Sequence, residues 1–206
     1  MAINVNKPVN EAPAVAVQAG RDIPTGDRSS KFSDIQVVKR RMIVVASALQ
    51  KHGKDHFAFT APGPIALHAF DEGWEDTAAK FRKAGKKIKV VEYDVPEATD
   101  KKRNNSLADE ADRIWSDFVA NYRWSLDNFK TVVLDTATEM WELLRLARFG
   151  ALSTGQTTSF GPVNAEMRKL IREAYNHNAN VIFLQKLGKK YVNREWDGSY
   201  EPKGFG

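Results

Sequence analysis

The chain has 206 residues, with 31 Lys and Arg against 26 Asp and Glu, a formal net charge of +5 and no cysteine. Hydrophobic residues make up 42% and charged residues 28% of the chain, a composition that argues against wholesale disorder and favours a core-forming domain. The lack of cysteine excludes disulfides and thiolate metal sites, and no run of about 18 apolar residues is present that would span a membrane.

The first 33 residues predict a flexible arm. They contain three prolines and show no apolar period of 2 or 3.6 residues. Ordered patterns begin after this stretch. We therefore expect an arm over residues 1–33 and one folded domain over residues 34–206.

Strand and helix patterns alternate along the domain. Short apolar runs predict strands over residues 42–46, 64–70, 87–93, 131–134 and 180–185. Helical spacing and capping signals predict helices over residues 57–60, 107–126, 136–149 and 162–176. Polar loops are expected over residues 96–106 and 150–160, and the Asp197-Gly198 dipeptide predicts a hairpin over residues 189–203. This order predicts an α/β fold, with a mainly parallel sheet, helices on both faces and a C-terminal hairpin.

A Gly-Lys pair, Gly53-Lys54, follows the first predicted strand and precedes a helix. In a phosphate-binding loop of the form G-x-x-x-x-G-K-[ST], the lysine contacts the β- and γ-phosphates and the hydroxyl binds Mg²⁺. Here the first glycine position holds Ala48 and the hydroxyl position holds Asp55. Next to a triphosphate, this carboxylate either binds the metal or repels the phosphates, and the sequence leaves both options open.

Asp135 ends the buried strand over residues 131–134. A carboxylate at this place holds Mg²⁺ in P-loop proteins. The following Thr136-Ala137-Thr138-Glu139 is a capping-box pattern, so the alternative is that Asp135 only caps the next helix.

Three further polar residues follow predicted strands. Asp71 and Glu72 follow the second strand, where a carboxylate can orient and deprotonate an attacking water, although they also fit a simple turn. Gln185 ends the fifth strand, where its amide can sense a γ-phosphate or merely terminate the strand.

Two other groups of residues favour structural interpretations. His52 and His56 are four residues apart, but no third metal ligand accompanies them in the sequence. The aromatic residues of the predicted helices are spaced as core residues rather than as base-stacking platforms; they are Trp115, Phe118, Tyr122 and Trp141.

Basic residues are concentrated between Arg168 and Arg194, a segment with seven cations and one acid. Such a segment suits a polyanionic partner, or is a solvated surface. The candidate contacts for a phosphate backbone are Arg168, Lys169, Arg172, Lys186, Lys189 and Lys190.

Several of these motifs, in this order, resemble the bacteriophage RecA-like P-loop ATPases. The resemblance covers about residues 38–204 and is carried by residues 50–54, 57–67, 71–73, 132–136, 161–174, 181–183 and 196–202. It implies a RecA-like core that binds ATP and Mg²⁺, assembles into a ring or filament, and acts on single-stranded DNA in annealing or recombination. It also implies the cytoplasm of an infected bacterial host as the location, and a phage single-strand-binding protein as a partner.

The resemblance assigns roles to matching residues of this sequence. The nucleotide loop would comprise Gln50, Lys51, His52, Gly53, Lys54 and Asp55. Asp135, with Asp55, would bind the metal, while Asp71 or Glu72 would act as the base and Gln185 as the γ-phosphate switch.

Two other functions remain open on the sequence. Ala48 and Asp55 favour a descendant that keeps the fold and binds DNA or assembles without turning over ATP. A motor or scaffold component that contacts only protein is the third interpretation.

Overall fold

The computed structural model describes residues 41–97, 104–151 and 160–203, which lie within one compact unit, Lys39–Gly206. The predicted arm over residues 1–33 lies outside the described residues, as do residues 98–103 and 152–159 of the two predicted loops.

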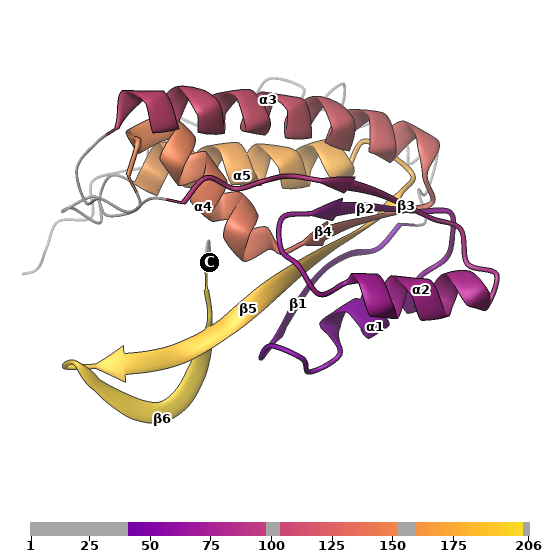
Figure 1. Ribbon diagram of the computed structural model, residues 1–206, viewed down its shortest axis with the longest axis horizontal. Helices are drawn as coiled ribbons and strands as arrows, with labels where there is room; N and C mark the ends of the chain where they lie inside the picture. The colour runs from indigo at the N-terminus through magenta and orange to yellow at the C-terminus, as the bar shows by residue number, and fades with distance from the viewer. Residues whose placement is uncertain (1–40, 98–103, 152–159, 204–206) are drawn as a thin grey trace, which may run out of the picture. The chain divides into compact units, whose positions relative to one another are not determined.

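The strands form one mixed sheet (Figure 1). Five strands are parallel to one another, in the order β1-β5-β4-β2-β3, and β6 pairs antiparallel with β5. Their bounds are β1 Ile43–Ala48, β2 Ile65–Ala69, β3 Ile88–Glu92, β4 Thr131–Asp135, β5 Asn180–Val192 and β6 Glu195–Pro202. The predicted α/β class, with its mainly parallel sheet and C-terminal hairpin, is confirmed.

Helices cover both faces of the sheet (Figure 1). On one face lie α3 Asn105–Asn128, α4 Ala137–Phe149 and α5 Gly161–Ala174, and on the other α1 Lys54–Thr60 and α2 Glu75–Lys83. Only α2 was missed by the sequence prediction. Its apolar residues Trp74, Ala78 and Phe81 recur at helical spacing and pack on the smaller core, but the stripe is short, Ala78 is its only fully buried member, and the sequence prediction did not pick it out among the surrounding charged residues.

The alternation of side chains along the central strands builds two cores. Val132 and Leu134 of β4 pack with α3, α4 and α5, whereas Val133 packs with α1 and α2. The larger core combines aliphatic and aromatic side chains, and Trp115, Phe118 and Tyr122 of α3 pack in it as predicted. The fourth predicted core aromatic, Trp141, is half-buried against this cluster.

The C-terminal hairpin differs from its prediction in where it turns. The fifth strand does not stop at Gln185 but runs to Val192, and the turn is formed by Asn193 and Arg194, with φ angles of 52° and 71°. Two consecutive residues with positive φ are typical of the tight turns that match strand twist. The Asp197-Gly198 pair instead lies within β6, opposite a register shift between Lys189 and Tyr191.

One buried polar group in the larger core gives a testable pH dependence. The His68 ring is fully buried, with Nδ1 3.0 Å from the Tyr93 hydroxyl and Nε2 3.1 Å from Ser125 Oγ. Burial lowers the pKa of His68 to about 4, from 6.5 when unfolded. Because the unfolded chain binds the proton more tightly, this contribution to stability is complete above about pH 6.5 and is lost as the pH falls toward 4.

We therefore expect the free energy of unfolding to fall by about 2 kcal/mol between pH 7.5 and pH 5 through this one group. Urea denaturation at the two pH values measures the difference. The His68→Gln variant, although less stable at both pH values, should lose this part of the pH dependence. An unchanged pH dependence in that variant would contradict the assignment.

Candidate functional site

The candidate site lies at the carboxyl ends of the parallel strands. One row of residues in register crosses the sheet there, with Asp135 of β4 flanked by Leu184 of β5 and Ala69 of β2. The loops that leave this edge carry the predicted site residues. This is the edge at which open α/β sheets bind ligands.

In the loop between β1 and α1, the residues with left-handed backbone conformation do not include Ala48. Ala48 ends β1 in extended conformation, while the left-handed residues are Lys51 and Gly53, with φ angles of 62° and 80°. The Gly53 carbonyl accepts the first hydrogen bond of α1, from Phe57 N at 3.0 Å. Glycine is therefore required at position 53 but not at position 48, and Ala48 does not hinder this turn.

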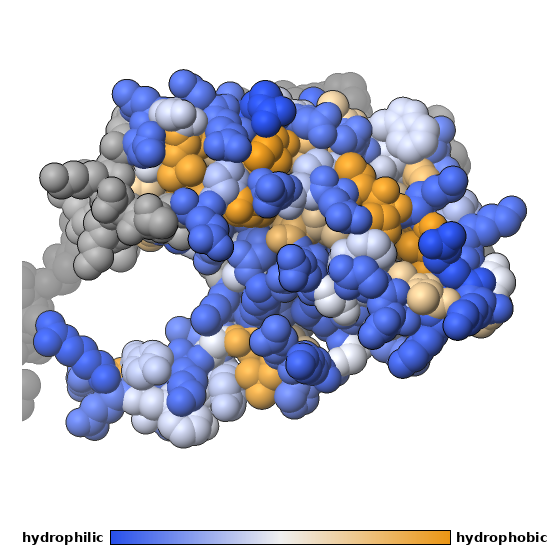
Figure 2. All heavy atoms as spheres, in the orientation of Figure 1, coloured by the Kyte–Doolittle hydropathy of each residue, from blue (hydrophilic) through white to orange (hydrophobic). Residues whose placement is uncertain are grey.

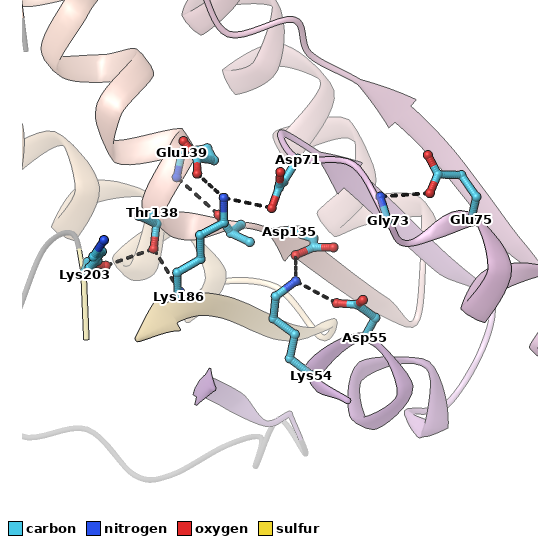
Figure 3. A network of polar contacts seen from close by, with 11 residues as sticks. Lys54, Asp55, Asp71, Gly73, Glu75, Asp135, Thr138, Glu139, Lys186 and Lys203 are labelled. Carbon is cyan, nitrogen blue, oxygen red and sulfur yellow. Dashed lines mark hydrogen bonds and ion pairs between the residues drawn. The ribbon is translucent and has the colours of Figure 1, made fainter. Parts of the chain in front are cut away.

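Lys54 joins the loop to the end of β4 (Figure 3). Its ammonium donates to Asp135 Oδ1 at 2.8 Å and to Asp55 Oδ1 at 2.9 Å. The side chains of Lys54 and Asp135 are 10% and 1% exposed. Residues 81 positions apart thus form a largely buried ion pair, a contact that the sequence analysis, which assigned Lys54 to phosphates and Asp135 to the metal, did not predict.

The site holds one lysine between two carboxylates. Burial lowers the pKa of Lys54, but Asp135 and Asp55 outweigh this effect, so its pKa is raised and it stays charged. Burial raises the pKa of Asp135 to about 6, because Lys54 offsets only part of the desolvation and Asp55 and Asp71 repel the negative charge. A further cation at this site would relieve the excess of negative charge.

Asp135 is not the cap of the following helix. Thr136 occupies the N-cap of α4, and its hydroxyl accepts from Glu139 N at 3.3 Å. The alternative that Asp135 serves only as a cap is therefore wrong, and its carboxylate faces Lys54 instead.

A second ion-pair cluster lies beside the first (Figure 3). Lys186 of β5 bonds to Asp71 Oδ2 at 2.9 Å and contacts the Glu139 carboxylate. Thr138 Oγ1 accepts from the Lys186 backbone N–H at 3.1 Å and donates to the Lys203 carbonyl at 3.0 Å. Sequence reasoning did not assign Thr138 or Glu139 to the site, although the capping-box pattern placed both in the first turn after Asp135.

The remaining candidates differ in burial. Gln185 is 3% exposed, and its Oε1 accepts from Ser47 Oγ on the neighbouring β1 at 3.1 Å. Glu72 is exposed and Asp71 is half-buried. Glu72 is therefore the more accessible of the two carboxylates proposed as the base.

An acidic cavity of about 800 Å³ adjoins Asp71. Its eight acids are Asp71, Glu72, Glu75, Glu92, Asp94, Glu97, Glu139 and Glu142. Burial, with repulsion from Glu139, raises the pKa of Glu142. Lys54 is not among its lining residues, so this negatively charged space is not where phosphate groups would meet the loop lysine.

The two histidines and the metal-binding candidates can also be placed. His52 donates through Nδ1 to the Gln50 carbonyl at 2.8 Å, and the His56 ring packs edge-on against Phe81. Within the described ranges, no three His, Asp or Glu side chains gather closely enough to hold a metal ion. Two carboxylates, those of Asp55 and Asp135, are what Mg²⁺ uses when phosphates complete its shell, so these residues fit a metal bound together with nucleotide.

The six predicted DNA contacts fall into three groups. Arg168, Lys169 and Arg172 are exposed on α5. On the hairpin, Lys190 pairs with Asp197 at 3.7 Å, and Lys189 Nζ lies 4.8 Å from the Trp196 ring centroid. Lys186 is committed to Asp71 and Glu139 and is not part of an open basic surface.

Among the described helices, none combines the length and apolar character needed to cross a membrane.

Comparisons with known proteins place this geometry in context. The sequence model of a family described as an AAA domain matches residues 39–204. No curated protein matches the chain. Among solved structures, the KaiC-like protein PH0186 from the hyperthermophilic archaeon Pyrococcus horikoshii OT3 is similar, with 14% identity over 78% of this chain and 84% of that chain and a TM-score of 0.36.

Proposed function

Because the chain belongs to the AAA domain family of P-loop proteins, we propose that it binds ATP with Mg²⁺ at the carboxyl edge of its sheet and hydrolyses it. The observation that carries the proposal is the convergence of Lys54 and Asp135, at 2.8 Å, from a loop and a strand end. A lysine after the loop and an acid at a strand end are the residue types that P-loop proteins use on the phosphates and the metal.

Each group has a defined task. Lys54 would turn from Asp135 to the β- and γ-phosphates, with the amides of the loop before α1 facing the same anion. Asp135 and Asp55 would hold Mg²⁺, which supplies charge neutralisation between the β- and γ-phosphates. Glu72 would accept a proton from the attacking water, because Asp71 is already bonded to Lys186.

Asp55 also favours the second candidate function, a domain that binds nucleotide without turnover. Its carboxylate stands in the first turn of α1, where a phosphate-binding loop has a hydroxyl, and competes with phosphate for Lys54 at 2.9 Å. In that case ATP binding would drive assembly or DNA binding without hydrolysis.

For the partner, we propose single-stranded DNA handled in annealing or recombination, by subunits assembled side by side. The exposed cations of α5, Arg168, Lys169 and Arg172, support a polyanionic partner.

Two measurements on the wild-type protein test these proposals. Calorimetric titration with ATP, with and without Mg²⁺, should show binding that Mg²⁺ strengthens. Phosphate release with and without single-stranded DNA then separates a DNA-stimulated ATPase from the non-hydrolysing alternative. Absence of ATP binding in the presence of Mg²⁺ would overturn both.

A further inference from the structure

The most basic stretch of the chain lies outside the predicted DNA contacts. Residues 77–91 contain six cations and no acid, a local charge of +6 in a chain whose total is +5. The cations are Lys80, Arg82, Lys83, Lys86, Lys87 and Lys89. They span the second half of α2, the following turn and the edge strand β3.

The structure arranges this stretch as a groove. A cavity of about 430 Å³ runs between α2 and β3, lined by Trp74, Ala78, Arg82, Lys86, Lys87, Ile88, Lys89 and Val90. Four of its eight lining residues are cations and the others are apolar. On the face drawn in Figure 2, hydrophilic side chains dominate the surface over α2.

The cations of this basic groove are available to a ligand. Arg82, Lys87 and Lys89 are exposed, and none of them forms an ion pair within residues 41–97, 104–151 and 160–203. Lys86 is held differently, since its ammonium donates to the Ala61 carbonyl at 2.8 Å and fixes the groove to the end of α1. In contrast, Lys186 and Lys190 of the predicted DNA set are each paired with a carboxylate.

The groove is separate from the nucleotide site. Lys87 directly precedes β3, whose first residue, Ile88, is in the same row as Ile65 and Thr131, whereas Asp135 is at the other end of β4. Four residues of strand separate the two rows, a distance of about 13 Å. The groove's cations are therefore placed for an anion other than the triphosphate bound near Lys54.

We propose that this basic groove binds the phosphodiester backbone of single-stranded nucleic acid. Arg82, Lys87 and Lys89 provide the phosphate contacts, which depend on charge rather than base sequence. Trp74 offers a half-buried indole at the same groove, and an aromatic surface beside cations favours unpaired bases, which can stack on it. The choice of nucleic acid rests on the proposed function, while the groove and its charge do not.

The position of Trp74 connects the groove to the candidate site. The same residue lines the acidic cavity beside Asp71 and follows the Asp71-Glu72-Gly73 turn that carries the proposed base. A strand bound in the groove would therefore contact the segment that positions Glu72.

The test compares two variants with the same loss of charge. The groove variant combines Arg82→Gln, Lys87→Gln and Lys89→Gln. The α5 variant combines Arg168→Gln, Lys169→Gln and Arg172→Gln. All six residues are exposed, so neither variant is expected to unfold. Binding of a fluorescein-labelled oligo-dT of about 20 nucleotides is followed by anisotropy across a salt series, and calorimetry measures ATP affinity in parallel.

We expect the groove variant to bind oligo-dT roughly 10- to 100-fold more weakly at low salt, with the slope of log K against log[salt] reduced by about 2 for three lost contacts. The α5 variant should change the slope less, and both variants should bind ATP as the wild type does. Unchanged DNA binding in the groove variant, or a larger loss in the α5 variant, would overturn the groove assignment. The groove assignment would also be overturned if the groove variant lost its binding to vesicles of anionic lipid while its DNA binding was unaffected. Failure of the wild type to bind ATP would instead overturn the proposed function. The comparison of DNA binding between the two variants would still test the groove assignment.

Discussion

Replacing Lys54 by Ala is expected to weaken ATP binding by at least about 100-fold, which corresponds to about 2.7 kcal/mol. Two effects add. The variant loses a charge-assisted bond to the phosphates, and it leaves Asp135 and Asp55 without the cation that both contact, at 2.8 and 2.9 Å. A bound triphosphate would then lie next to two carboxylates with no lysine ammonium to offset the repulsion between their negative charges.

The control for this variant is Lys130→Ala. Lys130 is exposed next to the first residue of β4, at the opposite end of the strand from Asp135, so its substitution removes the same charge without touching the site. Calorimetric titration at matched ionic strength compares the two variants with the wild type. Full ATP affinity in the Lys54 variant would show that the loop does not hold phosphates.

The proximity of Lys54 and Asp135 could be predicted because it depends on topology alone. A strand that ends in a loop and a helix, and a second parallel strand that ends in an acid, bring both residues to one edge of the sheet. The same reasoning left the cap of α4 undecided. The choice between Asp135 and Thr136 depends on side-chain direction, and the hydroxyl of Thr136 makes that bond.

The contacts of Lys186 could not be predicted from the order of residues along the chain. It follows the predicted fifth strand, residues 180–185, among other cations, so the sequence analysis grouped it with a basic surface. Its neighbours in space are Asp71, from the end of β2, and Glu139, from the start of α4. These contacts arise from the order of strands in the sheet, which the sequence prediction did not include.

The helix α2 explains why the basic groove was also missed. Eight of its nine residues are not buried, and its apolar stripe is limited to Trp74, Ala78 and Phe81, so the sequence prediction assigned no element to this stretch between two strands. Only when α2 lies beside the edge strand β3 do Arg82 and Lys89, seven residues apart, line one groove. The density of positive charge over residues 77–91 was the signal that could have identified this surface.

Replacing Asp135 by Asn is expected to abolish the Mg²⁺ dependence of ATP binding and to lower hydrolysis by about 100-fold or more, because the amide removes the buried charge that would hold the metal. The wild type should bind Mg²⁺ and ATP more tightly as the pH rises through about 6, the pKa to which burial raises Asp135. The variant should show a weaker pH dependence, because only the titration of the ATP γ-phosphate itself, which falls in the same range, would remain. Titrations with and without Mg²⁺ between pH 5 and pH 8 measure both.

Stability distinguishes loss of the metal ligand from damage to the fold. The folded state raises the pKa of Asp135 from 3.8, so its contribution favours folding only at low pH and is lost as the pH rises through about 6. At pH 7.5 the Asn substitution removes a desolvated charge, but it also takes one of two carboxylate partners from the largely buried Lys54, so the two effects oppose each other and the free energy of unfolding should change little. The exposed Asp109→Asn on α3 is the matched control and should change neither stability nor binding. An Asn variant that loses stability together with ATP binding would assign Asp135 a structural role, whereas little change in stability with loss of Mg²⁺ dependence is the pattern expected of a metal ligand.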